Sequence, residues 1–283
     1  MTTPISTQTA PTPEQVRAGW DRVARGFDEY LTPPNSALGD KLLRRHGVSA
    51  RMRMLDVAAG SGALTLPAAR LGAHVVATDI SPVMLDRLTI RARDEGLANV
   101  ETLVMDGHAL DLDDDTFDLA ASQHGVSLFP DMARAVREMA RVTRPGGSVL
   151  IVAAGPLPRT EFLTFFFGAV RAVITGFTGL PTDPPPLPFQ VADPDRLGDK
   201  LTGAGLTDVR VESDMWDIPV RSGVHLWDVV TSSNPLGAAA VADLTDEQTA
   251  EVRRVLDGML LERSGGGPEA VLHSAINVGV GTV

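Results

Sequence analysis

The chain has 283 residues, 43% of them hydrophobic, which is enough for one large α/β domain with a substantial core. Its formal net charge of −11 argues against nucleic acids and anionic membranes as partners, because phosphate groups are bound by basic patches. The sequence contains no cysteine, which excludes disulfides, thiolate metal sites and a cysteine nucleophile within it.

The N-terminal residues and the hydropathy pattern bear on location. No apolar run reaches the roughly 18 residues that span a bilayer, and the first residues lack the basic and apolar pattern of a secretory signal. We therefore expect a cytoplasmic protein with no membrane insertion, and we leave a homodimer open. Residues 1–13, rich in Thr and Pro, are expected to form a disordered arm.

Residues 13–30 have the spacing of an amphipathic helix, with apolar side chains at Val16, Trp20, Val23, Ala24 and Phe27. Residues 32–36 contain two prolines and predict a break, and a second helix is expected over 37–46. The aromatic side chains of Trp20, Phe27 and Tyr30 have two readings. They could close over a ligand, or they could simply pack in the core.

The stretch from 54 to 80 predicts a βαβ unit. An apolar strand over 54–57 is followed by a small-residue turn over 58–62, a short helix, and a second strand over 74–78 that ends on Asp79. Gly60 and Gly62 let the backbone approach a ligand closely, and the helix points its free N–H groups at that ligand. Asp79 is placed to accept both hydroxyls of a ribose, as in a nucleotide-binding Rossmann half.

Two residues of this stretch bear on the type of nucleotide. The dinucleotide fingerprint G-x-G-x-x-G lacks its third glycine here, where Thr65 stands instead. Asp56, just before the turn, would repel a pyrophosphate but suits a ligand that carries an amino group.

The third predicted strand, over 100–105, ends on Asp106. Together with Asp56 and Asp79, it places acids at the ends of three successive strands. This set suits a ligand with an ammonium, a ribose and an adenine amine. The alternative is that each Asp caps the element that follows its strand.

The fourth strand is predicted over 117–122 and is followed by Gln123 and His124. His124 is the best-placed general base, because an imidazole titrates near neutral pH. Alternatively, it only shapes the pocket or bonds to a backbone carbonyl. The acidic run over 111–115 reads as a solvated loop, because its spacing is not that of a metal loop. We predict no metal site.

Further elements follow in order. A helix over 131–143 precedes a Pro-Gly-Gly turn and a strand over 148–153. Residues 160–180 are apolar on all sides and could form core, an interface or a roof over the acceptor pocket. A short strand over 206–211, helices over 193–203, 222–231 and 245–262, and a last strand over 270–280 complete the chain.

Residues 20–153 resemble the class I S-adenosylmethionine (SAM)-dependent methyltransferases of the ubiquinone/menaquinone-biosynthesis type. The resemblance rests on WDRVARGFD in the leading helix, on LDVAAGSG, and on the Pro-Gly-Gly turn before the fifth strand. The glycine motif of that family usually reads D-x-G-x-G-x-G, and Ala58 takes the place of its first glycine here. The resemblance implies a Rossmann-like, seven-stranded, mostly parallel sheet with helices on both faces, an antiparallel last strand and a small helical cap.

The same resemblance implies SAM as cofactor and a small, largely apolar acceptor whose O, N or C atom is methylated. With this reading, His124, the best-placed general base, is the candidate catalytic residue. The cofactor residues it implies are Asp56, Ala58, Gly60, Gly62, Asp79, Ile80, Met84, Asp106, Gly107, His108 and Ser122. The chain would then divide into the arm (1–13), a SAM-binding core with its leading helices (14–153), an apolar cap insertion (154–192), and a part that completes the sheet and cap (193–283).

Two other functions remain open. An NAD-dependent oxidoreductase would share the glycine turn and Asp79, but it would leave Asp56 and Asp106 unexplained. It would also lack a Tyr-x-x-x-Lys pair, since Tyr30 is the only tyrosine. The second alternative is a non-catalytic SAM-binding protein of the same fold.

Overall fold

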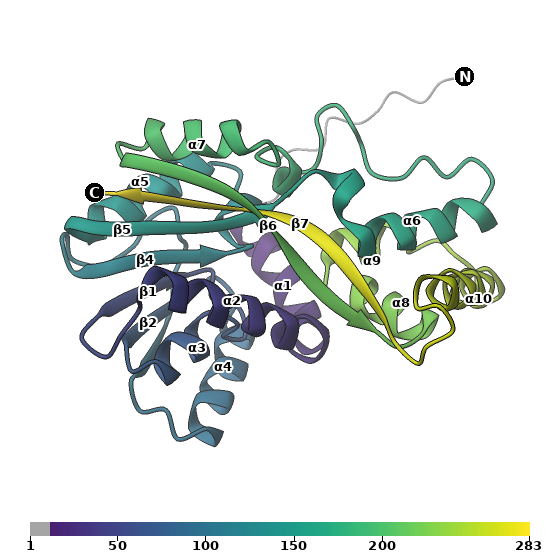
Figure 1. Ribbon diagram of the computed structural model, residues 1–283, viewed down its shortest axis with the longest axis horizontal. Coiled ribbons are helices and arrows are strands. Elements are labelled where there is room, and N and C mark those ends of the chain that lie inside the picture. Colours follow the sequence, from purple (N-terminus) through teal and green to yellow (C-terminus); the bar gives the residue numbers. More distant parts are fainter. Residues whose placement is uncertain (1–11) are drawn as a thin grey trace.

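The computed structural model describes residues 12–283, so the arm expected over 1–13 lies almost entirely outside the described residues. A seven-stranded sheet runs through the molecule in the order β3-β2-β1-β4-β5-β7-β6 (Figure 1). Strands β1 to β5 are parallel, and β7 is antiparallel to both β5 and β6. The predicted fold class is confirmed. The strands are β1 (Arg53–Val57), β2 (His74–Asp79), β3 (Val100–Val104), β4 (Phe117–Gln123), β5 (Thr143–Ala154), β6 (Thr207–Val220) and β7 (Ala270–Thr282).

Helices pack on both faces of the sheet (Figure 1). In the described part of the chain, none of them is both long enough and apolar enough to cross a bilayer. The helices are α1 (Pro13–Gly26), α2 (Thr32–His46), α3 (Thr65–Arg70), α4 (Pro82–Asp94), α5 (Met132–Val142), α6 (Glu161–Val173), α7 (Pro194–Gly203), α8 (Gly223–Thr231), α9 (Pro235–Ala240) and α10 (Asp246–Arg263).

The register of the parallel strands brings their carboxyl ends to one edge of the sheet. Asp56 on β1 pairs with Ala77 on β2 and with Ala121 on β4, and Asp79 ends β2 beside Val104 of β3. Strand β1 is buried except at its first residue, as expected for a central strand covered on both faces. In open α/β sheets the ligand binds at this edge.

The break predicted over 32–36 is wrong. A π-helical turn, η1 (Phe27–Leu31), follows α1 directly, and α2 begins at Thr32. Pro33 and Pro34 lie in the first turn of α2. Backbone N–H groups in a first turn have no carbonyl partner within the helix, so proline, which lacks this group, costs no hydrogen bond there. The chain is therefore helical from residue 13 to residue 46, with a π-helical turn just before the residues where a break was expected.

Strand β6 is much longer than the predicted 206–211. It pairs with β7 along its whole length, from Thr207 opposite Thr282 to Val220 opposite Ala270. The far half of this two-stranded ribbon extends beyond the parallel strands and carries α6, α8, α9 and α10 (Figure 1). Phe166 of the apolar helix α6 is fully buried in that lobe and packs against Trp227 of α8. Packing in the core accounts for the apolar character of α6.

Candidate functional site

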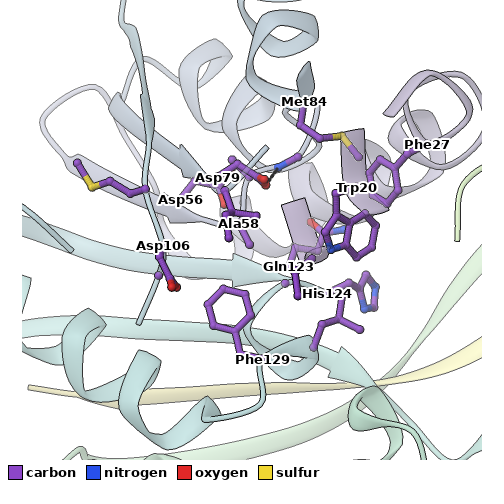
Figure 2. Close-up of a pocket in the computed structure, with 18 of the residues that line it drawn as sticks. Trp20, Phe27, Asp56, Ala58, Asp79, Met84, Asp106, Gln123, His124 and Phe129 are labelled. Atoms are coloured by element: carbon purple, nitrogen blue, oxygen red, sulfur yellow. Dashed lines mark hydrogen bonds between the residues drawn. The ribbon is translucent and has the colours of Figure 1, made fainter. Parts of the chain in front are cut away.

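A cavity of about 360 Å³ opens at the carboxyl ends of β1 to β4 and is covered by α1 (Figure 2). The cavity brings together most of the residues that were predicted from the sequence to bind the cofactor or to act in catalysis. Those that line it are Asp56, Ala58, Gly60, Asp79, Ile80, Met84, Asp106, Gly107, His108 and His124. Residues from four different strand ends and from the N-terminal helix therefore meet in one place.

Gly62 and Ser122, which were also predicted to contact the cofactor, lie outside the cavity lining. Gly62 has φ +95°, and a Cβ there would lie 2.3 Å from Leu88 Cδ1, so its task is to close the turn against α4. The Ser122 hydroxyl donates to the Val57 carbonyl at 2.7 Å and accepts from the Val126 N–H at 3.1 Å. Ser122 therefore fixes the loop after β4 against β1 instead of facing a ligand.

Asp56 is almost fully buried at the floor of the cavity. Its Oδ2 accepts the Thr65 hydroxyl at 2.6 Å, whereas Oδ1 is buried without a hydrogen-bond partner among residues 12–283. Burial raises the pKa of Asp56 to about 7, against the hydrogen bond from Thr65. A buried, unpartnered carboxylate oxygen is costly, and a cationic ligand in the cavity would satisfy it.

Asp79 organises the turn at the end of β2. Its Oδ2 accepts the Gly60 N–H and its Oδ1 accepts the Ser81 N–H, both at 2.9 Å. Each oxygen keeps a second lone pair for another donor. Burial raises the pKa of Asp79 to about 6, while the hydrogen bonds from Ser81 and Gly60 oppose that rise.

Asp106 lies at the end of the cavity where Phe129 is also found (Figure 2). Its Oδ1 accepts two hydrogen bonds from His108, one from the backbone N–H at 2.9 Å and one from the ring Nδ1 at 2.7 Å. Burial raises the pKa of Asp106, but these two bonds outweigh it and hold the pKa below its usual value. Asp106 is therefore a carboxylate at neutral pH.

Helix α1 and the π-helical turn η1 close the opposite end of the cavity (Figure 2). There the rings of Trp20 and Phe27 meet edge to face, with 6.2 Å between their centroids. Asp21 accepts the Ser81 hydroxyl at 2.5 Å, which ties α1 to the start of α4. The carboxylate of Asp28 pairs with Arg91 at 2.5 Å and with Arg87 at 3.3 Å. Trp20 and Phe27 both line the cavity, as the reading in which they cover a ligand requires.

Tyr30, by contrast, does not line the cavity. Its ring packs against His225 of α8, with the ring centroids 5.6 Å apart. The π-helical turn carries Tyr30 away from the cavity and toward the lobe. The expectation that Tyr30 also covers the ligand is therefore wrong.

His124 lines the cavity just after β4, on a backbone with φ +55°. Its ring lies 5.2 Å from that of Trp216, and its Nε2 is buried with no hydrogen-bond partner in the described residues. Burial lowers the pKa of His124 to about 4, so the imidazole is neutral at physiological pH. The alternative that the ring bonds to a backbone carbonyl is not what the structure shows.

Several residues that line the cavity were not singled out in the sequence. Among these are Asn35, Gln123, Leu128, Phe129 and Leu187. The Gln123 amide donates to the Asn35 carbonyl at 2.9 Å and to its side-chain oxygen at 3.1 Å, so β4 and α2 share a polar contact at the cavity wall. The helical pattern of α2 could have indicated Asn35 only if the prolines had been read as helix starters.

Among residues 12–283, no group of three or more His, Asp or Glu side chains has the geometry to hold a metal ion. The acidic run after β3 is instead engaged with α5. Arg141 donates to Asp114 at 2.5 Å and to the Leu110 and Leu112 carbonyls at 2.7 and 2.9 Å. This contact fixes the loop that precedes β4.

Comparison with known proteins points to one class. Residues 55–151 match the family model described as a methyltransferase domain. An uncharacterized protein of Mycobacterium tuberculosis is 40% identical over 125 residues, which are 44% of each chain. The ubiquinone/menaquinone biosynthesis C-methyltransferase UbiE of Idiomarina loihiensis is 40% identical over 110 residues, or 38% of this chain and 44% of the relative. The chain thus spans about half the length of the curated relatives it matches.

Solved structures share the fold over nearly the whole chain. The crystal structure of the [4+2]-cyclase SpnF has a TM-score of 0.59 at 19% sequence identity, and the match covers 97% of each chain. At this level of identity the likeness concerns the fold, and it includes the lobe beyond the parallel strands.

Proposed function

We propose that this chain, whose residues 55–151 form a class I SAM-dependent methyltransferase domain, transfers the methyl group of SAM to a small, largely apolar acceptor. The observation that carries the proposal is the buried, unpartnered Oδ1 of Asp56 in a cavity that Asp79 and Asp106 also line. These three acids end neighbouring strands, and they fit the three hydrogen-bonding parts of an adenosylated amino acid.

Each acid would take one part of the cofactor. Asp56 would accept the ammonium group, whose charge would lower the pKa of this buried carboxyl. Asp79 would accept the ribose hydroxyls with the lone pairs left free by Gly60 and Ser81, and Asp106 would accept the adenine amine through Oδ2. Ile80 and Met84 would contribute apolar walls.

The other end of the cavity would take the acceptor. Trp20 and Phe27 give it apolar walls, and Asn35, Gln123 and His124 are polar side chains that also line the cavity. Such walls favour an uncharged ring or chain with one or two hydrogen-bonding groups. We propose His124 as the catalytic residue, which would hold the nucleophilic atom of the acceptor by a hydrogen bond to its neutral ring.

Bound SAM would supply an electrophilic methyl group on a sulfonium, for in-line displacement by the acceptor. The residues of this chain would align the acceptor and exclude water, and these two effects can account for a large part of the rate enhancement. Helix α1 and the π-helical turn η1, held to α4 through Asp21 and Asp28 respectively, would provide the cover.

Calorimetric titration of the purified protein with S-adenosylhomocysteine, with NADH in parallel, tests the cofactor. We expect micromolar binding of the first ligand and none of the second. Binding of NADH alone would overturn the proposal in favour of an oxidoreductase. Incubation with SAM and a panel of apolar phenols, amines and enolisable ketones, read by mass spectrometry, then tests transfer.

The product mass also separates methyl transfer from other reactions. The [4+2]-cyclase SpnF has a similar fold, and one fold can serve unrelated reactions. A methylated product together with S-adenosylhomocysteine would support a methyltransferase. Cofactor binding with no methylated product from any acceptor would favour the non-catalytic alternative or a different reaction.

A further inference from the structure

We infer that the imidazole of His108 is a positioning residue that aims Asp106 at the adenine amino group and so sets the selectivity of the site for a 6-aminopurine. The inference rests on the proposed function, because it concerns the part of the cavity assigned to adenine. It adds a role for the His108 ring in positioning Asp106, whereas the resemblance implied only that His108 is one of the cofactor residues.

The two carboxylate oxygens of Asp106 differ in their hydrogen bonds. Oδ1 accepts both the His108 N–H at 2.9 Å and the His108 Nδ1 at 2.7 Å, so both of its lone-pair directions are used. A carboxylate has no proton to donate, and Nδ1 must therefore carry the hydrogen. Oδ2 is then the oxygen left to accept from a ligand in the cavity.

The His108 ring is itself held in place by packing. It lies against the ring of Phe129, with 4.7 Å between ring centroids and 32° between planes. Gly107 makes this contact possible, because a Cβ there would lie 2.6 Å from Phe129 Cε2. Phe129 therefore rests directly on the backbone between Asp106 and His108, at the end of the cavity away from Trp20 and Phe27 (Figure 2).

Asp106 needs this support because its own strand does not provide it. Its side chain is 40% exposed, so water competes for both oxygens and rotation about the last torsion angle is soft. The His108 backbone N–H alone would leave the carboxylate plane free to turn about one hydrogen bond. The second bond, from Nδ1, restrains that rotation and keeps Oδ2 directed at the ligand.

The test is calorimetry on the full chain with two ligands. They are S-adenosylhomocysteine and its 6-deamino analogue, in which hydrogen replaces the amino group and the ring nitrogens are unchanged. For the wild type we expect the amino ligand to bind roughly 10- to 100-fold more tightly, as for a hydrogen bond to a charged group. In His108→Ala this ratio should fall to about threefold or less, while affinity for the deamino ligand stays nearly constant.

Three further variants separate hydrogen bonding from packing. His108→Phe keeps a ring against Phe129 but removes the donor, so it should lose selectivity as His108→Ala does. His108→Asn keeps a donor and should recover part of the ratio. His74→Ala, at an exposed histidine on β2, is the matched control and should keep the wild-type ratio. Circular dichroism and thermal unfolding of each variant establish that it is folded.

Each result has one reading. Unchanged selectivity in His108→Ala and His108→Phe would overturn the positioning role, and so would an equal weakening of both ligands, which would mean that His108 only shapes the wall. A wild type that binds both ligands equally would also overturn it, because adenine would not be recognised through its amino group. A wild type that binds neither ligand would instead refute the proposed function.

Discussion

The methyl group of Ala58 fills the space that a side chain on Gly125 would need, since a Cβ on Gly125 would lie 2.6 Å from the Cβ of Ala58. Ala58 also has φ +57°, a conformation that costs a non-glycine residue about 1–2 kcal/mol. The glycine motif and the loop after β4 therefore meet at a strained, closely packed contact beside the cavity. Backbone strain of this kind is often found at functional sites.

This contact predicts a coupled pair of substitutions. Gly125→Ala should destabilise the protein by about 1–3 kcal/mol, because the new Cβ also meets Ser122 Oγ at 2.7 Å. Ala58→Gly should be neutral or stabilising by up to ~1 kcal/mol, since relief of strain is partly offset by a more flexible unfolded chain. In the double variant, urea unfolding should show that Ala58→Gly recovers part of the loss. Strict additivity would mean that the two residues do not share this space.

Burial of Asp56 predicts opposite effects on stability and on binding. The pKa of Asp56 is about 7 in the folded protein, above the ordinary value of 3.8. Between those pH values this carboxyl therefore binds more protons in the folded protein than in the unfolded chain. The contribution of Asp56 to stability should therefore fall as pH rises through this window. Asp56→Asn should remove that dependence and stabilise the ligand-free protein at pH 8, with a ceiling of ~4 kcal/mol, as measured by denaturant unfolding.

The same variant should bind S-adenosylhomocysteine more weakly, because the ammonium loses its anionic partner. Wild-type affinity should rise from pH 6 to pH 8, as Asp56 ionises, and the Asp56→Asn variant should lack that rise. Calorimetry in two buffers of different ionisation enthalpy would also show proton release on binding near pH 7. A pH-independent wild-type affinity would argue against Asp56 as the ammonium partner.

Asp79→Ala should weaken binding of S-adenosylhomocysteine by about 10- to 100-fold, because a buried ribose would lose a charged acceptor. The Gly60 and Ser81 N–H groups would lose their partners as well, so some of the effect would come from a looser turn. Asp86→Ala, on the exposed side of α4, is the control and should leave affinity unchanged. Wild-type affinity in Asp79→Ala would place the ribose elsewhere.

Asp28→Asn should loosen the cover of the cavity, because it weakens the pairs with Arg87 and Arg91. We expect a loss of about 1 kcal/mol in stability and faster dissociation of S-adenosylhomocysteine in stopped-flow fluorescence of the tryptophans. Asp94→Asn is a suitable comparison, since Asp94 is exposed and pairs only loosely with its neighbour Arg93 at 3.8 Å. Equal dissociation rates in both variants would show that the contact between η1 and α4 does not control release.

His124→Ala should lower turnover of any acceptor found in the screen, while affinity for S-adenosylhomocysteine stays within about threefold of wild type, because His124 is proposed to contact the acceptor. Burial lowers the pKa of His124 to about 4, so protonation of its ring should not reduce kcat/KM between pH 6 and pH 9. A wild-type acid limb near pH 6.5 that disappears in His124→Ala would instead identify an ordinary, solvated general base.

The strand-end acids could be predicted from the sequence because neighbouring parallel strands deliver their carboxyl ends to one edge. To place Asp56, Asp79 and Asp106 at one edge, it is enough to know that their strands are neighbours, and the βαβ pattern predicts this. Phe129 was missed, because its place depends on how the loop after β4 folds back over Gly107. Asn35 was missed because two prolines suggested a loop where a helix begins.

The length of β6 could not be predicted for a related reason. Glu212 and Asp214 make the middle of β6 polar. Because these charged residues interrupt the strand pattern, the strand was predicted to end at residue 211. In the structure these acids pair with Arg45 at 3.3 Å and with Lys41 at 2.9 Å, both on α2. Contacts between residues so far apart in the chain are not encoded in local periodicity.

The position of β7 imposes an order on folding. Among the described strands, β7 is the only neighbour through which β6 joins the sheet, yet it follows β6 in the chain by some fifty residues. Strands β1 to β5 can pair as they are synthesised, whereas β6 and the helices of the lobe must wait until β7 inserts beside β5. The lobe beyond the parallel strands therefore assembles last, through contacts of high sequence separation, which are slow to form.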